Sequence, residues 1–311
     1  MANIAIAGLG NIGNAIITTY DVQRSQNTDI IITGVIRRKL PHNGKKMTLP
    51  YNDIEAVTDV NNLTTKPQVI LCAAPSGVVK QDAIKYLNAG YCTVDCFDDH
   101  TKIYEQKMEL DAIAKKNKAV SIIATGWDPG FDSALRALYA QLSPTGTTFT
   151  TFGPGRSMGH TTTAKAIPGV IDAVSLTLPG EKPGTHKREL YLVAPPAMHA
   201  EIEAQVQAHP YFVKTETQET FVKFVDDVSP FDTSDHGGWL YNKGAGLNVH
   251  VETKLHGNNP IMTANMMFAA ARAAAAAQDA GQYGCFTVIE RPLIDFIPGF
   301  TIQEKLARIR Y

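Results

Sequence analysis

The stretch Gly8-Leu9-Gly10-Asn11-Ile12-Gly13 decides how the rest of this chain is interpreted. It follows an apolar run at residues 1–7, which predicts a β-strand, and it precedes residues 14–20, which predict a helix. A G-x-G-x-x-G sequence between a strand and a helix is the context that the dinucleotide-binding fingerprint requires. Its glycines allow a tight turn and a close approach of the backbone, and the pyrophosphate then lies at the helix N-terminus. The alternative is a glycine-rich turn in an ordinary βα unit.

The next predicted strand indicates which dinucleotide is bound. Residues 30–36 form a continuous apolar run, as expected for a parallel strand that is buried on both faces. A chain that binds NAD usually ends this strand with Asp or Glu, which holds the ribose 2′-hydroxyl. Here Arg37-Arg38-Lys39 follows, and guanidinium groups can hold the additional phosphate of NADP with charge-assisted hydrogen bonds. A solvated basic turn is the alternative, but the position favours NADP.

Length and composition are typical of a globular protein with two domains. The 311 residues are enough to bury a sizeable core. The 29 basic and 30 acidic residues nearly cancel, which gives no support to binding of nucleic acid or of a membrane surface. No run approaches the roughly 18 apolar residues of a membrane helix, and the first strand leaves no room for a signal peptide. The four cysteines form no C-x-x-C pair or zinc set, so we expect reduced thiols, no metal and a cytoplasmic location.

Strands and helices alternate in the first part of the chain. Apolar runs at residues 69–74, 91–95 and 120–124 predict strands, and residues 78–89 and 104–116 predict helices. This alternation favours an α/β fold with a Rossmann-type doubly wound parallel sheet, in which ligands bind beyond the carboxyl ends of the strands. The residues expected to bind the cofactor are therefore Gly8, Leu9, Gly10, Asn11, Ile12, Gly13, Arg37, Arg38, Cys72, Ala73, Ala74, Pro75, Ser76, Cys96, Phe97, Gly126, Trp127, Pro129 and Gly130.

The pattern changes after about residue 130. Residues 147–152, 187–194 and 219–225 look like separate strands of a more open, antiparallel sheet, divided by loops that are rich in Gly, Pro and His. This region is long enough to supply a substrate pocket and a dimer surface.

The end of the chain returns to the first domain. Residues 262–280 are rich in alanine, which predicts a packed helix, and residues 286–289 are expected to add a strand or an edge. We predict a dinucleotide-binding domain of residues 1–127 plus 266–311. A second, α+β domain of residues 128–265 is then expected to bind the substrate and to form the dimer.

Carboxylates gather at two neighbouring strand ends. Asp98 and Asp99 follow one predicted strand, and Asp128 follows the next. Carboxylates beside a nicotinamide site favour a cationic substrate, since Asp pairs with an ammonium group. For each residue the alternative is a turn former or a helix N-cap, for Asp99 in particular. In the second region Arg188 is suited to a carboxylate, and a site with both kinds of group fits a zwitterionic amino acid.

Longer motifs follow the fingerprint along the chain. They are Arg37-Arg38, Asp98-Asp99-His100, Thr125-Gly126-Trp127-Asp128-Pro129-Gly130, Gly153-Pro154-Gly155 with Gly159-His160, Ile167-Pro168-Gly169-Val170, Thr177-Leu178-Pro179, His186-Lys187-Arg188 and His236-Gly237-Gly238. Through these strings the chain resembles the meso-diaminopimelate dehydrogenase family over essentially its whole length. The T-G-W-D-P-G and G-P-G-x-S-x-G-H strings are far more specific than the fingerprint alone.

The resemblance implies a reaction and a set of roles. The reaction is the NADP-dependent, reversible oxidative deamination of meso-2,6-diaminopimelate at its D-centre, which yields L-2-amino-6-oxopimelate and ammonia and serves lysine and diaminopimelate biosynthesis. Asp98 and Asp128 would hold the reacting amino group as the catalytic pair. The other residues that would bind the substrate are Trp127, Phe152, Met158, Gly159, Thr177, Arg188, His236 and Asn259. The resemblance also implies a homodimer.

Two departures from the family pattern bear on specificity. Many members carry Trp where Phe152 stands, and residues 178–185 form a shorter segment than in many of them. Both departures place this chain nearer the branch of the family in which simple D-amino acids are expected as substrates. Two alternatives therefore stand beside the main interpretation: a dehydrogenase of another diamino or D-amino acid, such as 2,4-diaminopentanoate, and a non-catalytic protein that binds NADP.

Overall fold

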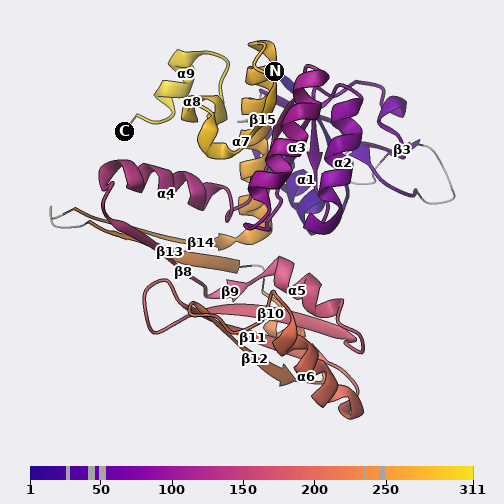
Figure 1. Ribbon diagram of the computed structural model, residues 1–311. Helices are drawn as coiled ribbons and strands as arrows, with labels where there is room; N and C mark the ends of the chain where they lie inside the picture. The colour runs from indigo at the N-terminus through magenta and orange to yellow at the C-terminus, as the bar shows by residue number, and fades with distance from the viewer. Residues whose placement is uncertain (26–28, 41–45, 49–53, 234, 245–248, 311) are drawn as a thin grey trace. The chain divides into compact units, whose positions relative to one another are not determined.

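The computed structural model describes residues 1–25, 29–40, 46–48, 54–233, 235–244 and 249–310 (Figure 1). The chain divides into two compact units, Met1–Ala134 with Pro260–Tyr311 and Leu135–Asn259. The sequence places these two boundaries after residues 127 and 265. Among the described residues, no helix has the length and apolar character that a membrane crossing requires.

A sheet in the order β15-β7-β6-β5-β1-β2-β4-β3 forms the centre of the first unit (Figure 1). Its strands are β1 (Ala2–Ala7), β2 (Ile30–Ile36), β3 (Lys46–Thr48), β4 (Glu55–Val57), β5 (Val69–Cys72), β6 (Cys92–Asp95), β7 (Val120–Ile122) and β15 (Gly284–Phe286). Neighbouring strands are parallel except for the edge pair of β3 and β4. The chain starts in β1 and extends the sheet in both directions, so the strand order reverses between β1 and β5. The predicted doubly wound parallel sheet is confirmed.

Apolar side chains cover both faces of this sheet. Along β1, Ile4 and Ile6 belong to one apolar core, and the alternate residues Ala5 and Ala7 belong to another. A strand that is buried on both faces has a continuous apolar sequence, which is why these strands could be predicted from their apolar runs. The helical segments of this unit are α1 (Asn11–Gln23), η2 (Val60–Asn62), α2 (Ser76–Asn88), α3 (Ile103–Lys116), α7 (Asn259–Asp279), η5 (Val288–Glu290), α8 (Leu293–Phe296) and α9 (Ile302–Ala307).

Helix α7 joins the end of the chain to its beginning. Its alanines from Ala264 to Ala277 lie in the same core as Ile4, because small side chains let a helix approach the sheet closely. Its one buried cation, Arg272, donates from Nε to Asp29 Oδ2 at 2.8 Å. The backbone N–H of Gly299 donates to the same oxygen at 3.1 Å. One buried carboxylate thus ties the start of β2 to α7 and to the C-terminal segment.

The second unit contains two sheets, β12-β11-β10-β9 and β14-β13-β8. Their strands are β8 (Thr147–Phe152), β9 (Gly155–Arg156), β10 (Asp172–Pro179), β11 (His186–Val193), β12 (Gln218–Phe224), β13 (Asp235–Lys243) and β14 (His250–Asn258). Its helical segments are α4 (Phe131–Leu142), which begins before the boundary, α5 (Met158–Lys165), η3 (Pro196–Met198), α6 (His199–Ala208) and η4 (Ser229–Phe231). Ala164 of α5 and Ile202 of α6 pack with Leu190 of β11 in one core, so both helices cover the same sheet.

The prediction of one open, antiparallel sheet in this region is wrong in two respects. β8 pairs with β13 and therefore belongs to the other sheet. β11 and β12 run parallel, with His186 opposite Gln218. Between these two strands the chain passes through η3 and α6, and a helical crossover is what brings a second strand back in the same direction. Alternation along the sequence locates a strand but does not identify its partner.

Candidate active site

The fingerprint forms an open cradle at the N-terminus of α1. Gly8 has a positive φ of 103°, and a Cβ there would lie 2.9 Å from the carbonyl oxygen of Ala73. A Cβ at Gly13 would lie 2.2 Å from the carbonyl oxygen of Gly8, so the helix and the turn need both glycines. Gly10 is the N-cap residue of α1, and it has open space around it. No side chain in the described part of the chain caps the first N–H groups of the helix. The first N–H groups of α1 are therefore available to an anion, and the residues fit a dinucleotide pyrophosphate.

The arginine pair follows β2, the strand next to β1. The Arg37 N–H donates to the carbonyl oxygen of Val57 at 2.8 Å, which fixes the backbone at the carboxyl end of the strand. Arg37 is half-buried and Arg38 is exposed. Neither side chain forms an ion pair with a described carboxylate. Two uncompensated guanidinium groups beside the cradle fit the 2′-phosphate of NADP.

Ser76 and Asp98 connect the loops that follow β5 and β6. The Ser76 hydroxyl donates to Asp98 Oδ1 at 2.5 Å, and the backbone N–H of Asp98 donates to the Ser76 oxygen at 3.1 Å. The Ala73 N–H continues the sheet by donating to Ala7 at 2.9 Å. The predicted cofactor residues 72–76 thus lie beside the fingerprint turn, and Ser76 holds one of the two predicted catalytic carboxylates.

His100 and Asp128 bring together the loops that follow the adjacent strands β6 and β7. His100 Nε2 lies 3.5 Å from Asp128 Oδ2, and this contact raises the pKa of His100. Asp98 and Asp128 are half-buried on these two loops, as predicted from the strand ends. Asp99 instead accepts hydrogen bonds from the N–H and the hydroxyl of Thr101 and forms an ion pair with Lys102, which is a turn-forming arrangement.

The T-G-W-D-P-G string forms a turn that only glycine permits. Gly130 has a φ of 143°, and a Cβ there would lie 2.0 Å from the carbonyl oxygen of Gly126. Trp127 is buried, and its carbonyl accepts the N–H of Asp132 in the first turn of α4. The turn therefore fixes the position of Asp128 between a buried indole and the start of a helix.

Asp95 was not predicted as a site residue, yet it hydrogen-bonds to both loops that carry the predicted catalytic carboxylates. Its Oδ1 accepts the N–H of Phe97 at 3.0 Å and that of Ala124 at 3.2 Å. Its backbone oxygen accepts the N–H and the hydroxyl of Thr125, at 2.9 and 2.8 Å. Ala124 has a φ of 56°, an unfavourable conformation for alanine that these bonds stabilise. Burial raises the pKa of Asp95 to about 6.

We expect Asp95→Asn to become more stable relative to the parent protein as the pH rises. The folded state binds the proton of Asp95 more tightly than the unfolded state, because the pKa is raised from 3.8 to about 6. The free energy of unfolding therefore has its full contribution from this proton below the unfolded pKa, and it loses that contribution as the pH rises through the folded pKa. The loss amounts to about 3 kcal/mol, because each pKa unit corresponds to about 1.4 kcal/mol. Asparagine keeps the acceptor oxygen and does not ionise. Urea unfolding at pH 4 and pH 8 measures the change, with the exposed Asp226→Asn as control; an equal difference at both pH values would contradict it.

Arg188 on β11 is a buried cation in the second unit. Its guanidinium donates from Nη1 to the Thr177 hydroxyl at 3.0 Å and from Nη2 to Gln218 Oε1 at 3.2 Å. Arg188 is only 3% exposed, and no described carboxylate pairs with it. Burial lowers its pKa to about 10, so it remains protonated at neutral pH. An unpaired buried charge is costly, and a carboxylate ligand would compensate it.

Histidines surround this cation. Burial lowers the pKa of His160 far below its usual value, and the positive charge of Arg188 lowers it further. The pKa of His186 is lowered for the same two reasons. His160 and His186 are therefore neutral beside the protonated Arg188 at physiological pH. His236 on β13 is buried and contributes to the same electrostatic environment.

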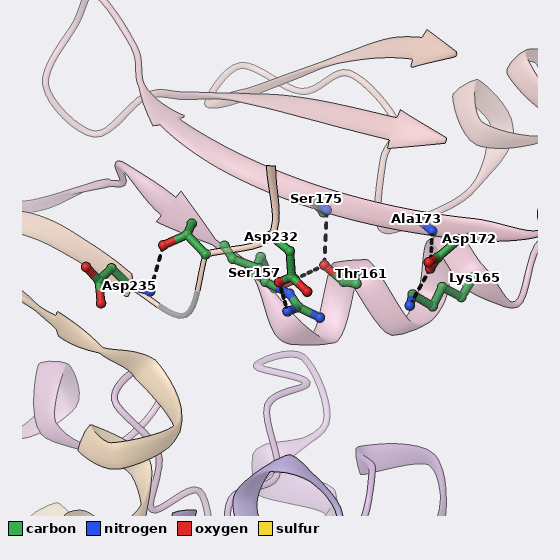
Figure 2. A network of polar contacts seen from close by, with 10 residues as sticks. Ser157, Thr161, Lys165, Asp172, Ala173, Ser175, Asp232 and Asp235 are labelled. Atoms are coloured by element: carbon green, nitrogen blue, oxygen red, sulfur yellow. Dashed lines mark hydrogen bonds and ion pairs between the residues drawn. The ribbon is translucent and has the colours of Figure 1, made fainter. Parts of the chain in front are cut away.

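Hydrogen bonds hold α5 against β10 beside Arg188. Thr161 donates to the Ser157 carbonyl at 2.7 Å and accepts the N–H of Ser175 at 3.0 Å (Figure 2). At the other end of the helix, Lys165 pairs with Asp172 at 2.5 Å (Figure 2). This anchoring orients the first turn of α5, which carries the predicted residues Met158 and Gly159.

The G-P-G string brings the two sheets of the second unit together. Gly153 has a φ of 97°, and a Cβ there would lie 2.4 Å from the carbonyl oxygen of Thr177. Phe152, at the end of β8, meets the His186 ring edge-on at a centroid distance of 5.6 Å. The structure therefore brings Phe152, Thr177 and Arg188 into one neighbourhood. Asn259 is the first residue of α7.

Comparisons with known proteins show which family the chain resembles. A sequence model described as the diaminopimelic acid dehydrogenase C-terminal domain matches residues 126–255. The chain is 39% identical over 299 residues to a meso-diaminopimelate D-dehydrogenase of Bacteroides fragilis, covering 95% of each chain. It is 31% identical over 310 residues to a meso-diaminopimelate D-dehydrogenase of Corynebacterium glutamicum, covering 92% of each.

Two solved structures share the whole fold. The Corynebacterium glutamicum DAP dehydrogenase in complex with DAP has a TM-score of 0.87 at 29% identity, with 99% of each chain covered. An engineered D-amino acid dehydrogenase bound to NADP+ has a TM-score of 0.83 at 28% identity, again with 99% of each chain covered. With the identities above, these matches show that the chain belongs to the meso-diaminopimelate D-dehydrogenase family.

Proposed function

We propose that the protein is an NADP-dependent dehydrogenase that reversibly deaminates meso-2,6-diaminopimelate at its D-centre. The products are L-2-amino-6-oxopimelate, NADPH and ammonia, in the service of lysine and diaminopimelate biosynthesis. The observation that carries the proposal is the buried, uncompensated guanidinium of Arg188, because a simple amino acid has no second carboxylate for it. The names of the relatives and the ligand of the solved DAP dehydrogenase support the same substrate.

Asp98 and Asp128 are proposed to act on the reacting amino group. Hydride leaves Cα only when the lone pair of the nitrogen is available, so the substrate ammonium must first lose a proton. A carboxylate, directly or through water, accepts that proton and stabilises the iminium cation that forms. Neither of the two carboxylates is assigned as the sole base. Water then adds to the iminium carbon, and ammonia leaves.

The second unit is proposed to bind the distal, L-configured end. Arg188 takes the distal carboxylate with charge-assisted hydrogen bonds, and Thr177, His236 and Asn259 complete the polar contacts. Phe152, Met158, Gly159 and Trp127 shape the pocket. These anchors keep the D-centre in one orientation, so only one face of Cα is offered for hydride transfer.

NADP accepts the hydride when it is bound, and the fingerprint cradle with Arg37 and Arg38 is proposed to hold it. Alanine at both arginine positions is expected to raise the KM for NADP by at least about 10–100-fold, since the loss of even one hydrogen bond to a charged group costs about 1.5–3 kcal/mol. The KM for NAD should stay within about threefold, because NAD lacks the phosphate. Steady-state kinetics with both cofactors measures this, with Lys39→Ala as control. An equal rise for NAD would contradict the assignment.

The proposal is tested by following NADPH formation at 340 nm with meso-diaminopimelate, its LL and DD isomers, and D-alanine. Activity with NADP that needs a D-centre and prefers the meso isomer would support it. Comparable turnover of D-alanine would instead indicate a broad D-amino-acid dehydrogenase and draw attention to Phe152. Tight NADP binding without turnover of any amino acid would leave a cofactor-binding protein that is not an enzyme.

We also propose a cytoplasmic homodimer. In support, Leu138 and Leu142, one turn apart on α4, and Phe149 of β8 are exposed apolar side chains in the second unit. Arg136 of α4 hydrogen-bonds Thr150 of β8, so the helix lies beside this strand. We expect sedimentation equilibrium to give twice the mass of the chain, and Leu142→Arg to shift it towards the single chain. A single-chain mass for the parent protein would contradict the dimer.

A further inference from the structure

Gln218, the first residue of β12, makes four polar contacts with its side-chain amide. Its Oε1 accepts from Arg188 Nη2 at 3.2 Å and lies 3.2 Å from His186 Nε2. Its Nε2 donates to the backbone oxygens of Tyr211 at 3.0 Å and Val213 at 3.5 Å. None of the sequence motifs includes this residue.

These contacts leave the amide one orientation. Two carbonyl oxygens hold the NH₂ group, so the oxygen must face Arg188. The reverse orientation would place donor against donor at Arg188 and acceptor against acceptor at the two carbonyl oxygens. The same argument assigns the tautomer of His186, whose Nε2 carries the proton that Gln218 accepts. Its Nδ1 is then an acceptor, and it has no partner among the described residues. The glutamine therefore orients both groups at once.

Gln218 gives Arg188 a neutral amide as its partner, whereas nearby lysines have carboxylate partners. Lys187 pairs with Glu181, Lys214 with Glu219, and Lys223 with Glu189. Arg188, the most buried of these cations, is instead held by neutral oxygens from Gln218, Thr177 and Ser175. A glutamate here would form an ion pair with Arg188 and satisfy it internally. The neutral amide fixes the guanidinium and leaves its charge for a ligand.

We propose that Gln218 is a positioning residue that makes Arg188 selective for a substrate with a second carboxylate. This inference rests on the proposed function, in which Arg188 takes the distal carboxylate. Gln218 itself need not touch the substrate. Its contribution is to hold Arg188 in one direction without neutralising it, so that the site distinguishes a dicarboxylic amino acid from a monocarboxylic one of the same length.

The test compares D-2-aminopimelate with D-2-aminoheptanoate, which lacks only the distal carboxylate. The parent enzyme should prefer the first in kcat/KM. Gln218→Glu is expected to reduce this preference by about 10–100-fold, mainly through KM for D-2-aminopimelate, because the new carboxylate competes for the guanidinium. The kcat/KM for D-2-aminoheptanoate should change by less than about threefold. Gln205→Glu, which adds the same charge at a half-buried position of α6, should leave the preference unchanged.

Gln218→Met removes the contacts without adding a charge and is expected to reduce the preference by a smaller factor, about 3–10-fold. It also tests the inference if the glutamate variant fails to fold. An equal loss for both substrates would overturn the specificity role and leave a structural one, and so would an unchanged preference in both variants. If the parent enzyme deaminates both substrates equally, the assignment of Arg188 in the proposed function fails first, whatever the variants do.

Discussion

Arg188→Met is expected to lower kcat/KM for meso-diaminopimelate by about 10²–10³-fold, which would be among the largest effects of any single change in this protein. Removing one partner of a buried, hydrogen-bonded charge pair typically costs about 2–5 kcal/mol, and here the proposed second partner is the distal carboxylate of the substrate. The loss should appear mainly in KM. Steady-state kinetics with meso-diaminopimelate and D-alanine measures it, since D-alanine has no distal carboxylate and should be turned over no worse.

The fold should survive this substitution. Arg188 is buried without a carboxylate partner among the described residues, so an apolar side chain of similar length removes a desolvated charge and should leave the free energy of unfolding unchanged or higher. Lys187→Met is the matched control, because adjacent residues of a strand point to opposite faces and Lys187 pairs with Glu181 instead. If Arg188→Met affected both substrates equally, Arg188 would not be the distal anchor.

Asp128→Asn is expected to lower kcat by about 10²–10⁴-fold with little change in the KM for NADP. General acid–base catalysis contributes a factor of this size, and asparagine cannot accept the substrate proton. The variant should also return the pKa of His100 towards its ordinary value, because the contact with Asp128 is the main cause of its rise. Single-turnover kinetics and an NMR titration of the His100 ring measure the two effects independently.

Asp99→Asn is the natural control for the loop. Asparagine preserves the turn with Thr101, and Asp99 forms its ion pair with Lys102. Its kcat should stay within about threefold of the parent value, the range of an ordinary surface substitution. Equal damage from both variants would show that the net charge of the region, and not a proton acceptor at Asp128, supports catalysis.

Much of the first unit could be predicted because its signals are local. The fingerprint needs only a strand, three glycines and a helix in order, and each buried parallel strand is a continuous apolar run. The carboxylates Asp98 and Asp128 were placed by the same logic, since both follow neighbouring strands of the predicted sheet. The structure brings their loops together through His100.

What could not be predicted depends on contacts between distant residues. Gln218 meets Arg188 only because β11 and β12 run parallel, and the pairing of two strands is not encoded in the pattern of either. Asp95 looks like the last polar residue of a strand. Its role becomes visible only when the N–H of Ala124, in the segment that follows β7, is seen to donate to its carboxylate. The roles assigned to the site residues stay predictions until the variants above are measured.

The division of the chain has a consequence for its synthesis. The first unit consists of Met1–Ala134 and Pro260–Tyr311, whereas the second is one continuous segment. A ribosome therefore completes the second unit while the sheet of the first still lacks α7, whose alanines fill the core beside Ile4, and its edge strand β15. At roughly 5–20 residues per second, that apolar face stays uncovered for about 10–30 s after β7 has been made. The nascent chain is thus most open to chaperones, and to aggregation, during that interval.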